Sequence, residues 1–175
     1  MQTAQTNRVT SLSTLPSNEI TVLFICTGNI FRSMTAEYTL RASVDKTTGV
    51  RARSAGLVDA PHEVVPFVRQ YLDERAIDIS GHTPRKLDAS MFSGADLVVA
   101  MDIAHQNAIQ QQFGVLPPLF NQVAYGTDTA MPDVDEMIPD WRQNEEAARA
   151  YCHSVMDTIS LGMGGFIRRL PLFLK

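Results

Sequence analysis

The chain has 175 residues, of which 45% are hydrophobic, and its formal net charge is −4. This length allows one domain with a sizeable buried core, and the negative charge argues against general nucleic-acid binding, which requires a basic surface. The cysteines, Cys26 and Cys152, are too few for a disulfide framework or for a zinc site of the usual spacing. We therefore expect no metal or other cofactor and a reducing, cytoplasmic location.

Residues 1–18 are polar and contain no apolar stretch of the kind found in a secretory signal. We interpret them as a flexible tail and assign residues 19–175 to a single domain. The apolar stretch 166–175 is interrupted by Arg168 and Arg169, and no run approaches the ~18 apolar residues that a membrane span requires. The sequence therefore predicts no membrane contact, and core packing is the preferred interpretation of residues 166–175.

The remaining sequence alternates between apolar runs and helical patterns. In chain order, the predicted elements are a buried strand at 20–25, a helix opening at 33–37, a strand at 50–54, a helix at 62–75, a strand at 96–101, a helix ending at 113, an edge strand at 119–123 and a closing helix at 145–161. Asp102 and Gly114 are expected to cap the helix between them, and Pro117 and Pro118 place the fourth strand at an edge. The pattern predicts an α/β fold: a single domain with a four-stranded parallel sheet, helices on both faces and a ligand site at the carboxyl ends of the strands.

The stretch from Cys26 to Ser33 joins the first strand to the first helix and places a cysteine and an arginine in one loop. Backbone N–H groups in such a loop converge on an anion, and the helix dipole adds positive potential there. A thiol in this position ionises readily, and the planar fork of Arg32 fits two phosphoryl oxygens. Gly28 permits close approach of the backbone and Asn29 tolerates a left-handed conformation. We therefore predict that Cys26 is a nucleophile towards phosphorus.

The predicted phosphate-binding residues are Thr27, Gly28, Asn29, Ile30, Phe31, Arg32 and Ser33. A thiolate that attacks a phosphate ester needs a carboxylic acid to protonate the leaving oxygen. The irregular stretch 124–144 supplies the candidates, which are Asp128, Asp133, Asp135, Glu136 and Asp140. A loop of that length in a compact domain is more often functional than not.

The loop resembles the phosphate-binding loop of the low-molecular-weight protein tyrosine phosphatases, whose pattern is C-x-G-N-x-C-R-S. Phe31 stands where the family usually has a second cysteine. The resemblance continues through residues 54–56, 81–85, 96–102 and 138–140, and it covers about residues 20–160. It implies hydrolysis of phosphotyrosine through a phosphocysteine intermediate, without a metal. The implied partner is a phosphotyrosine-containing protein and, if the chain is bacterial, a tyrosine kinase of polysaccharide export.

The resemblance also implies roles for particular residues. Asp140, which follows Ile138-Pro139, matches the general acid, although the family usually has proline where this chain has Trp141; Asp133 and Asp135 remain alternatives. Ile30 and Trp141 are expected to line the substrate cleft, and Ser33 to stabilise the Cys26 thiolate. The residues expected to keep the loop in shape are Asn29, Ser33, Ser54 and His82.

Three other interpretations stay open. Arsenate reductases share this fold and loop but pass oxidising equivalents to further cysteines, and this chain offers only Cys152, which we expect to lie beyond disulfide reach of Cys26. Protein arginine phosphatases carry a threonine at the position of Ile30, so the apolar side chain favours an aryl phosphate. A phosphopeptide-binding module without activity is the third, and an intact set of Cys26, Arg32 and Asp140 argues against it.

Overall fold

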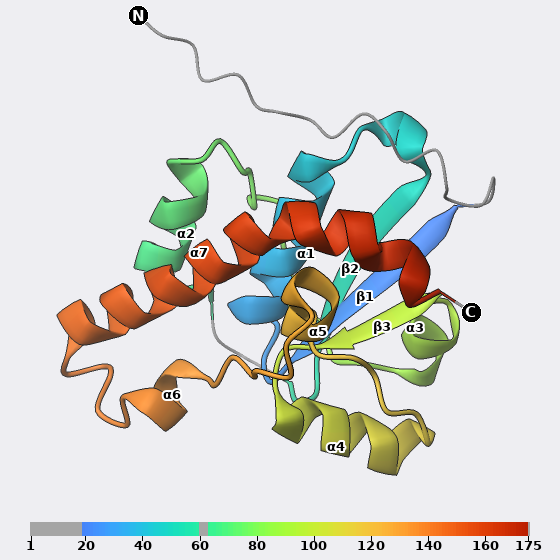
Figure 1. The fold of residues 1–175 in the computed structure, drawn as a ribbon. Coiled ribbons are helices and arrows are strands. Elements are labelled where there is room, and N and C mark those ends of the chain that lie inside the picture. The colour runs from blue at the N-terminus through green and yellow to red at the C-terminus, as the bar shows by residue number, and fades with distance from the viewer. Residues whose placement is uncertain (1–18, 60–62, 175) are drawn as a thin grey trace, which may run out of the picture.

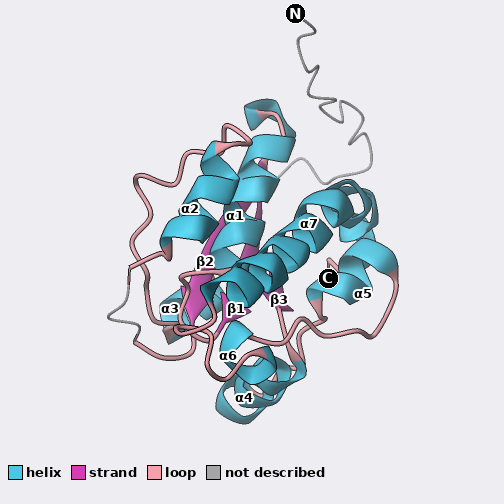
Figure 2. Ribbon diagram, turned by 90° about the vertical axis from the view of Figure 1, so that its left-hand side faces the viewer, coloured by secondary structure: helices cyan, strands magenta, loops and turns pink. Residues whose placement is uncertain are grey.

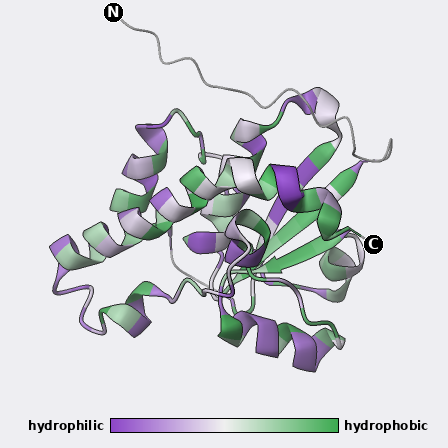
Figure 3. Ribbon diagram, in the orientation of Figure 1, coloured by the Kyte–Doolittle hydropathy of each residue, from purple (hydrophilic) through white to green (hydrophobic). Residues whose placement is uncertain are grey.

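The structure is a computed structural model that describes residues 19–59 and 63–174 (Figure 1). Its centre is a parallel sheet of three strands in the order β2-β1-β3, formed by β1 (Ile20–Cys26), β2 (Val50–Gly56) and β3 (Leu97–Ala100). β1 is the middle strand and is buried on both faces, which explains its continuous apolar sequence. In the hydropathy colouring of Figure 3, β3 is a continuous hydrophobic segment, whereas β2 also contains hydrophilic residues. The carboxyl end of β1 is Cys26, paired with Gly56 of β2.

Helices cover both faces of the sheet, as the sequence predicts (Figure 2). They are α1 (Arg32–Ser43), α2 (Pro66–Asp73), α3 (Ala89–Ser93), α4 (Ile103–Phe113), α5 (Phe120–Tyr125), α6 (Val134–Met137) and α7 (Glu145–Arg169). One buried cluster joins Val22 and Phe24 of β1 to helices α1, α2, α5 and α7. A second cluster joins Leu23 and Ile25 to residues of α3 and α4. Alternate side chains of one strand therefore enter two separate cores.

The predicted fourth strand at 119–123 is wrong. Leu119 makes a single parallel bridge to Ala100, and the chain then enters α5. Phe120, Val123 and Ala124 are buried at helical spacing, the Gln122 side chain accepts a hydrogen bond from the Leu119 N–H at 2.6 Å, and Gly126 ends the helix with a φ of 73°. Capping at both ends and a buried face thus stabilise a helix where the two prolines indicated an edge strand.

Other differences concern the ends of elements. The helix predicted at 62–75 begins at Pro66 as α2, and His62 lies outside the described residues, as do residues 1–18. The closing helix continues to Arg169. Phe166, Ile167 and Leu170 of the apolar stretch are buried in the core, whereas Leu172 is exposed. Asp102 and Gly114 cap α4 as predicted. Across residues 19–59 and 63–174, no helix is both long enough and apolar enough to span a membrane.

Candidate active site

The loop from Cys26 to Arg32 connects β1 to α1 at the carboxyl edge of the sheet. Asn29 has a φ of 58°, the left-handed conformation that its short polar side chain tolerates. Gly56, at the end of β2, lies directly against this loop: a Cβ atom there would be 2.7 Å from the Thr27 carbonyl oxygen and 2.9 Å from the Gly28 carbonyl carbon. The missing side chain of Gly56 is therefore what lets the loop pass so close to the strand.

Cys26 is buried at the base of the loop and has two polar neighbours. Its Sγ lies 2.9 Å from the Ser33 Oγ, and the Asn29 backbone N–H donates to Sγ over 3.3 Å. Both neighbours are placed to donate a hydrogen bond to this sulfur when it attacks or leaves. This is the contact that the sequence predicts for Ser33.

Asn29 is fully buried and links the loop to the rest of the molecule. Its side-chain amide donates to Ser33 Oγ at 3.1 Å and to Ser54 Oγ at 2.7 Å. Its backbone carbonyl oxygen accepts a hydrogen bond from His82 Nε2 at 2.7 Å, and its side-chain Oδ1 accepts one from the Arg85 backbone N–H at 3.1 Å. The structure thus brings the four residues predicted to shape the loop into one network, and their effect on activity stays a prediction.

Glu37 extends this network and was missed by the sequence analysis. The carboxylate is fully buried on α1, accepts a hydrogen bond from Ser54 Oγ and pairs with Arg41 one helical turn later. The spacing of Glu37 and Arg41 is typical of an ordinary surface ion pair, so the sequence alone gave no reason to bury this acid.

Arg32 is fully buried and is held from three sides. Its guanidinium donates to the Met131 carbonyl oxygen at 2.7 Å and to Thr27 Oγ1 at 3.3 Å, and it forms an ion pair with Asp133. Its Nε is buried without a hydrogen-bond partner among the described residues. Three of its five N–H groups are engaged, so the guanidinium is fixed in place and keeps donors for a further acceptor.

His105, on α4, contributes a contact that the sequence analysis did not find. Its Nε2 lies 3.1 Å from Thr27 Oγ1, the hydroxyl that also accepts from Arg32. Burial, followed by the nearby Arg32 charge, lowers the pKa of His105 from 6.5 to about 4. A neutral imidazole at neutral pH adds no second positive charge beside Arg32.

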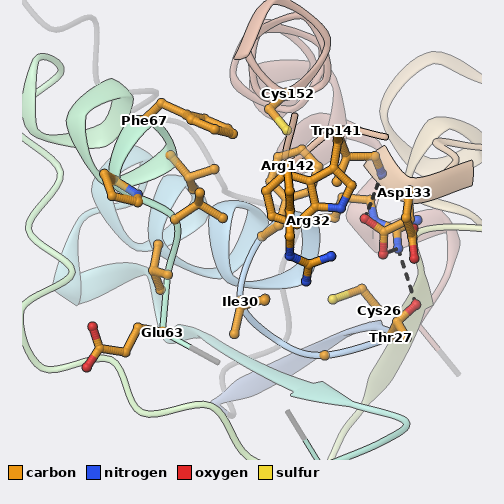
Figure 4. A pocket seen from close by; sticks show the side chains of 18 of the residues that line it. Cys26, Thr27, Ile30, Arg32, Glu63, Phe67, Asp133, Trp141, Arg142 and Cys152 are labelled. Atoms are coloured by element: carbon orange, nitrogen blue, oxygen red, sulfur yellow. Dashed lines mark hydrogen bonds and ion pairs between the residues drawn. The ribbon is translucent and has the colours of Figure 1, made fainter. Parts of the chain in front are cut away.

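A cavity of about 530 Å³ opens above the loop (Figure 4). Cys26 and Arg32 line it together with the predicted cleft residues Ile30 and Trp141. Further apolar wall comes from the segment before and within α2, which contributes Val58, Val64, Val65, Pro66, Phe67 and Val68. The nucleophile thus lies in a pocket with largely apolar sides, a shape that fits a flat ring attached to an anion.

Asp140 does not reach this pocket. Its side chain is exposed, and its carbonyl oxygen accepts from the backbone of Gln143 and Asn144 in a turn before α7. Asp133, one of the alternatives, lines the pocket, caps the N-terminus of α6 and contacts Arg32. Asp135 also borders the cavity. The structure therefore brings Asp133 to Arg32, and which of the two carboxyl groups serves as the acid stays a prediction.

Cys152, on α7, lines the same cavity as Cys26. It is buried, and burial followed by the Asp133 charge raises the pKa of its thiol to about 12. Cys152 is therefore a neutral thiol at physiological pH. The sequence analysis placed it on the closing helix but did not expect it in the pocket wall, because nothing in its spacing relates it to the loop.

Comparison with known proteins identifies the family of the chain. The family model of low molecular weight phosphotyrosine protein phosphatases matches residues 21–162. A probable low molecular weight protein-tyrosine-phosphatase from Ralstonia nicotianae is 35% identical over 92 residues, which are 53% of this chain and 62% of the relative. An arsenate reductase from Bacillus cereus is 34% identical over 111 residues, which are 63% of this chain and 77% of the relative. The chain thus spans less than two thirds of the first of these relatives.

The fold resembles a solved arginine phosphatase from Geobacillus stearothermophilus, with a TM-score of 0.72 over 87% of this chain and 94% of that chain, at 24% identity. At that identity the likeness concerns the fold alone. The family model covers the strands, the loop with Cys26 and Arg32, and Asp133. The chain therefore belongs to the low molecular weight phosphotyrosine protein phosphatase family.

Proposed function

We propose that this protein is a protein tyrosine phosphatase that hydrolyses phosphotyrosine through a phosphocysteine intermediate. The observation that carries the proposal is the juxtaposition of Cys26, Arg32 and Asp133 at the base of one pocket with apolar walls. The free donor on Arg32 and the N–H groups of the loop suit the three non-bridging oxygens of a phosphoryl group.

In the first step, Cys26 Sγ attacks phosphorus and the bond to the phenolic oxygen breaks. A phosphoryl group in the loop competes with Asp133 for Arg32, and this competition releases the carboxyl group to face the leaving oxygen. We propose that Asp133 donates the proton that converts the leaving phenoxide to a phenol. Asp140, whose exposed side chain is not among the pocket-lining residues although the adjacent Trp141 and Arg142 are, stays the alternative acid.

In the second step, water attacks the phosphocysteine and Asp133 accepts its proton. The S–P bond breaks, inorganic phosphate forms and Cys26 leaves as a thiolate beside Ser33 Oγ and the Asn29 N–H. Atoms balance as one ester plus one water giving one phenol and one phosphate. Each proposed residue therefore acts in both halves of the cycle, with no metal required.

The pocket wall supports an aryl substrate over the related chemistries. Ile30, where the arginine phosphatases carry threonine, is apolar and lines the same cavity as Trp141 and Phe67. Arsenate reduction would need Cys26 to pass oxidising equivalents to another cysteine, and Cys152 is a neutral thiol buried in the wall. A cytoplasmic location fits a mechanism that depends on a reduced thiol. A tyrosine kinase of polysaccharide export remains the proposed protein substrate.

One comparison tests the proposal. Steady-state hydrolysis of phosphotyrosine and phosphoarginine peptides is measured in EDTA, beside arsenate reduction with thioredoxin. We expect metal-independent turnover of phosphotyrosine, with a higher kcat/KM than for phosphoarginine, and no arsenate reduction. Preference for phosphoarginine, or arsenate-dependent consumption of thioredoxin, would replace this function by one of its alternatives. Binding of the peptides without any turnover would instead indicate a phosphopeptide-binding module.

A further inference from the structure

Arg142 is a second arginine on the pocket, and nothing in the proposed chemistry uses it. It lies in the turn that precedes α7, and its Cζ is 4.4 Å from the centroid of the Trp141 ring. Figure 4 shows its guanidinium turned into the pocket, near Ile30 and Cys26 in the view. A cation stacked on an indole keeps its position while its N–H edges stay available for an acceptor.

The guanidinium of Arg142 has no carboxylate partner within the described ranges 19–59 and 63–174. The nearby Glu145 pairs with Arg149 at 2.9 Å, and Asp59, on the same cavity, lies 3.4 Å from Lys86. Asp133 is engaged by Arg32. Glu63 and Asp135 also line the cavity, but no described carboxylate lies within ion-pair distance of Arg142. Arg142 is thus held against an aromatic ring rather than by an ion pair.

Arg142 differs from Arg32 in its exposure to solvent. Arg32 and the loop occupy the buried floor, whereas Arg142 is exposed at the rim. A second cavity of about 170 Å³ adjoins the first, and Trp141 and Arg142 line both. A peptide with its phosphotyrosine ring in the first cavity and its chain along the second would contact Arg142.

We propose that Arg142 forms a subsite for an acidic side chain next to the phosphotyrosine of a peptide substrate. This rests on the proposed function and adds a substrate class, phosphotyrosine flanked by Asp or Glu. A carboxylate fits the guanidinium fork in a way that an amide of the same shape does not, because charge and paired acceptors both contribute. Partly exposed pairs of this kind are weak, so the subsite tunes selectivity and does not determine binding.

The test uses phosphotyrosine peptides that differ only by Glu, Gln or Lys at each position flanking the tyrosine. The ratio of kcat/KM for Glu to that for Gln is measured for the native protein, Arg142→Gln, Arg142→Glu and the control Arg168→Gln, which removes the same charge from the far end of α7. We expect a ratio of about three at one or more positions in the native protein and the control. We expect about one in Arg142→Gln, and preference for Lys in Arg142→Glu.

If Arg142→Gln keeps the native ratio of kcat/KM between the Glu and Gln peptides, the subsite is overturned. An equal loss of kcat/KM for all peptides and for a small aryl phosphate also overturns it, because Arg142 would then act on the phosphoryl group or the ring. The preference should shrink as salt is raised. The same peptides are also tested by calorimetric binding to Cys26→Ser proteins with and without the Arg142 change. That measurement needs no turnover, so a missing preference is distinguishable from a failure of the proposed function, which appears as absent hydrolysis in the native protein.

Discussion

Asp133 forms an ion pair with Arg32 although 101 residues of chain separate them. The carboxylate is carried by the segment before α7, and the guanidinium by the first turn of α1. The pair closes the pocket floor opposite Cys26 and fixes two groups of opposite charge where a phosphate ester would bind. Removing Arg32 or Asp133 would leave the other charge without its partner at the base of the pocket, and removing Asp133 would also remove the proposed proton donor.

Asp133→Asn should lower kcat by about a hundredfold or more with phosphotyrosine, because the amide has no proton to give to a phenoxide that leaves poorly. The loss should be smaller with an activated aryl phosphate, whose leaving group needs less protonation. Steady-state kinetics with both substrates measure the difference. Asp140→Asn is the matched control and should retain native kinetics; the reverse pattern would return the role of acid to Asp140.

The choice between these two acids shows where sequence reasoning stops. Met131-Pro132-Asp133 and Ile138-Pro139-Asp140 are both an apolar residue, a proline and an aspartate, seven positions apart. Either fits the expected spacing before the closing helix. The three-dimensional path of residues 131–133, with the Met131 carbonyl on Arg32, is the reason that we propose Asp133, and the two substitutions decide between them.

Cys26→Ser should abolish hydrolysis while phosphate binding remains measurable, since the hydroxyl fills the space of the thiol but is hardly ionised. Turnover above a few per cent of the native rate would contradict a phosphocysteine mechanism. Arg32→Lys should also be severe, because an ammonium cannot reproduce the fork that contacts Met131, Thr27 and Asp133. Calorimetry with phosphate and a progress curve with an aryl phosphate check both changes.

The two cysteines should differ in reactivity. Burial raises the pKa of Cys152 to about 12, so it remains a thiol at pH 7.5, and only the thiolate alkylates. Iodoacetamide should therefore modify the folded protein at Cys26 and inactivate it, with phosphate protecting. Peptide mapping by mass spectrometry measures the site. Cys152→Ala should show the same rate of inactivation, whereas modification of Cys152 in step with lost activity would contradict the assignment.

His105 should make stability depend on pH. Its pKa is lowered in the fold from 6.5 to about 4, so between these values the unfolded chain binds a proton that the folded protein excludes. Its stabilising contribution is complete above about pH 6.5 and falls as the pH drops towards 4, by about 2 kcal/mol at pH 5. Urea unfolding of the native protein and of His105→Asn at pH 7.5 and pH 5 isolates this effect. Equal losses in the two proteins would show that His105 does not titrate this way.

Gly56→Ala should displace the phosphate-binding loop, because residue 56 lies at the end of β2 directly against it. The new methyl group would meet the Thr27 carbonyl oxygen at 2.7 Å, and backbone atoms yield less readily than side chains. We expect unfolding free energy to fall by about 1–3 kcal/mol and kcat/KM for an aryl phosphate to fall about tenfold or more. Gly81→Ala, where a Cβ meets nothing within 4 Å, is the control. A native kcat/KM in Gly56→Ala would mean that the loop tolerates displacement.

The fold was predictable to the extent that each element shows its own pattern. The apolar run of β1, the capped α4 and the position of the phosphate loop all follow from local sequence. The prediction of a strand at 119–123 was wrong because a segment of five residues with apolar ends fits a strand pattern and a helix pattern equally well. The segment forms helix α5, which packs against α7. Tertiary packing likewise brings His105, Glu37 and Cys152 to the site, and the spacing of these residues in the sequence does not predict it.

The network around Asn29 has a consequence for how activity returns after denaturation. Its side chain and carbonyl bond to Ser33, Ser54, His82 and Arg85, which lie 4, 25, 53 and 56 residues away. Contacts of such long range form late, because loop closure costs entropy before the contacts stabilise the chain. In a refolding experiment, helical signal should therefore recover before phosphatase activity. Recovery of activity would therefore indicate that the native state is complete, whereas recovery of the helical signal would indicate only that local structure has formed.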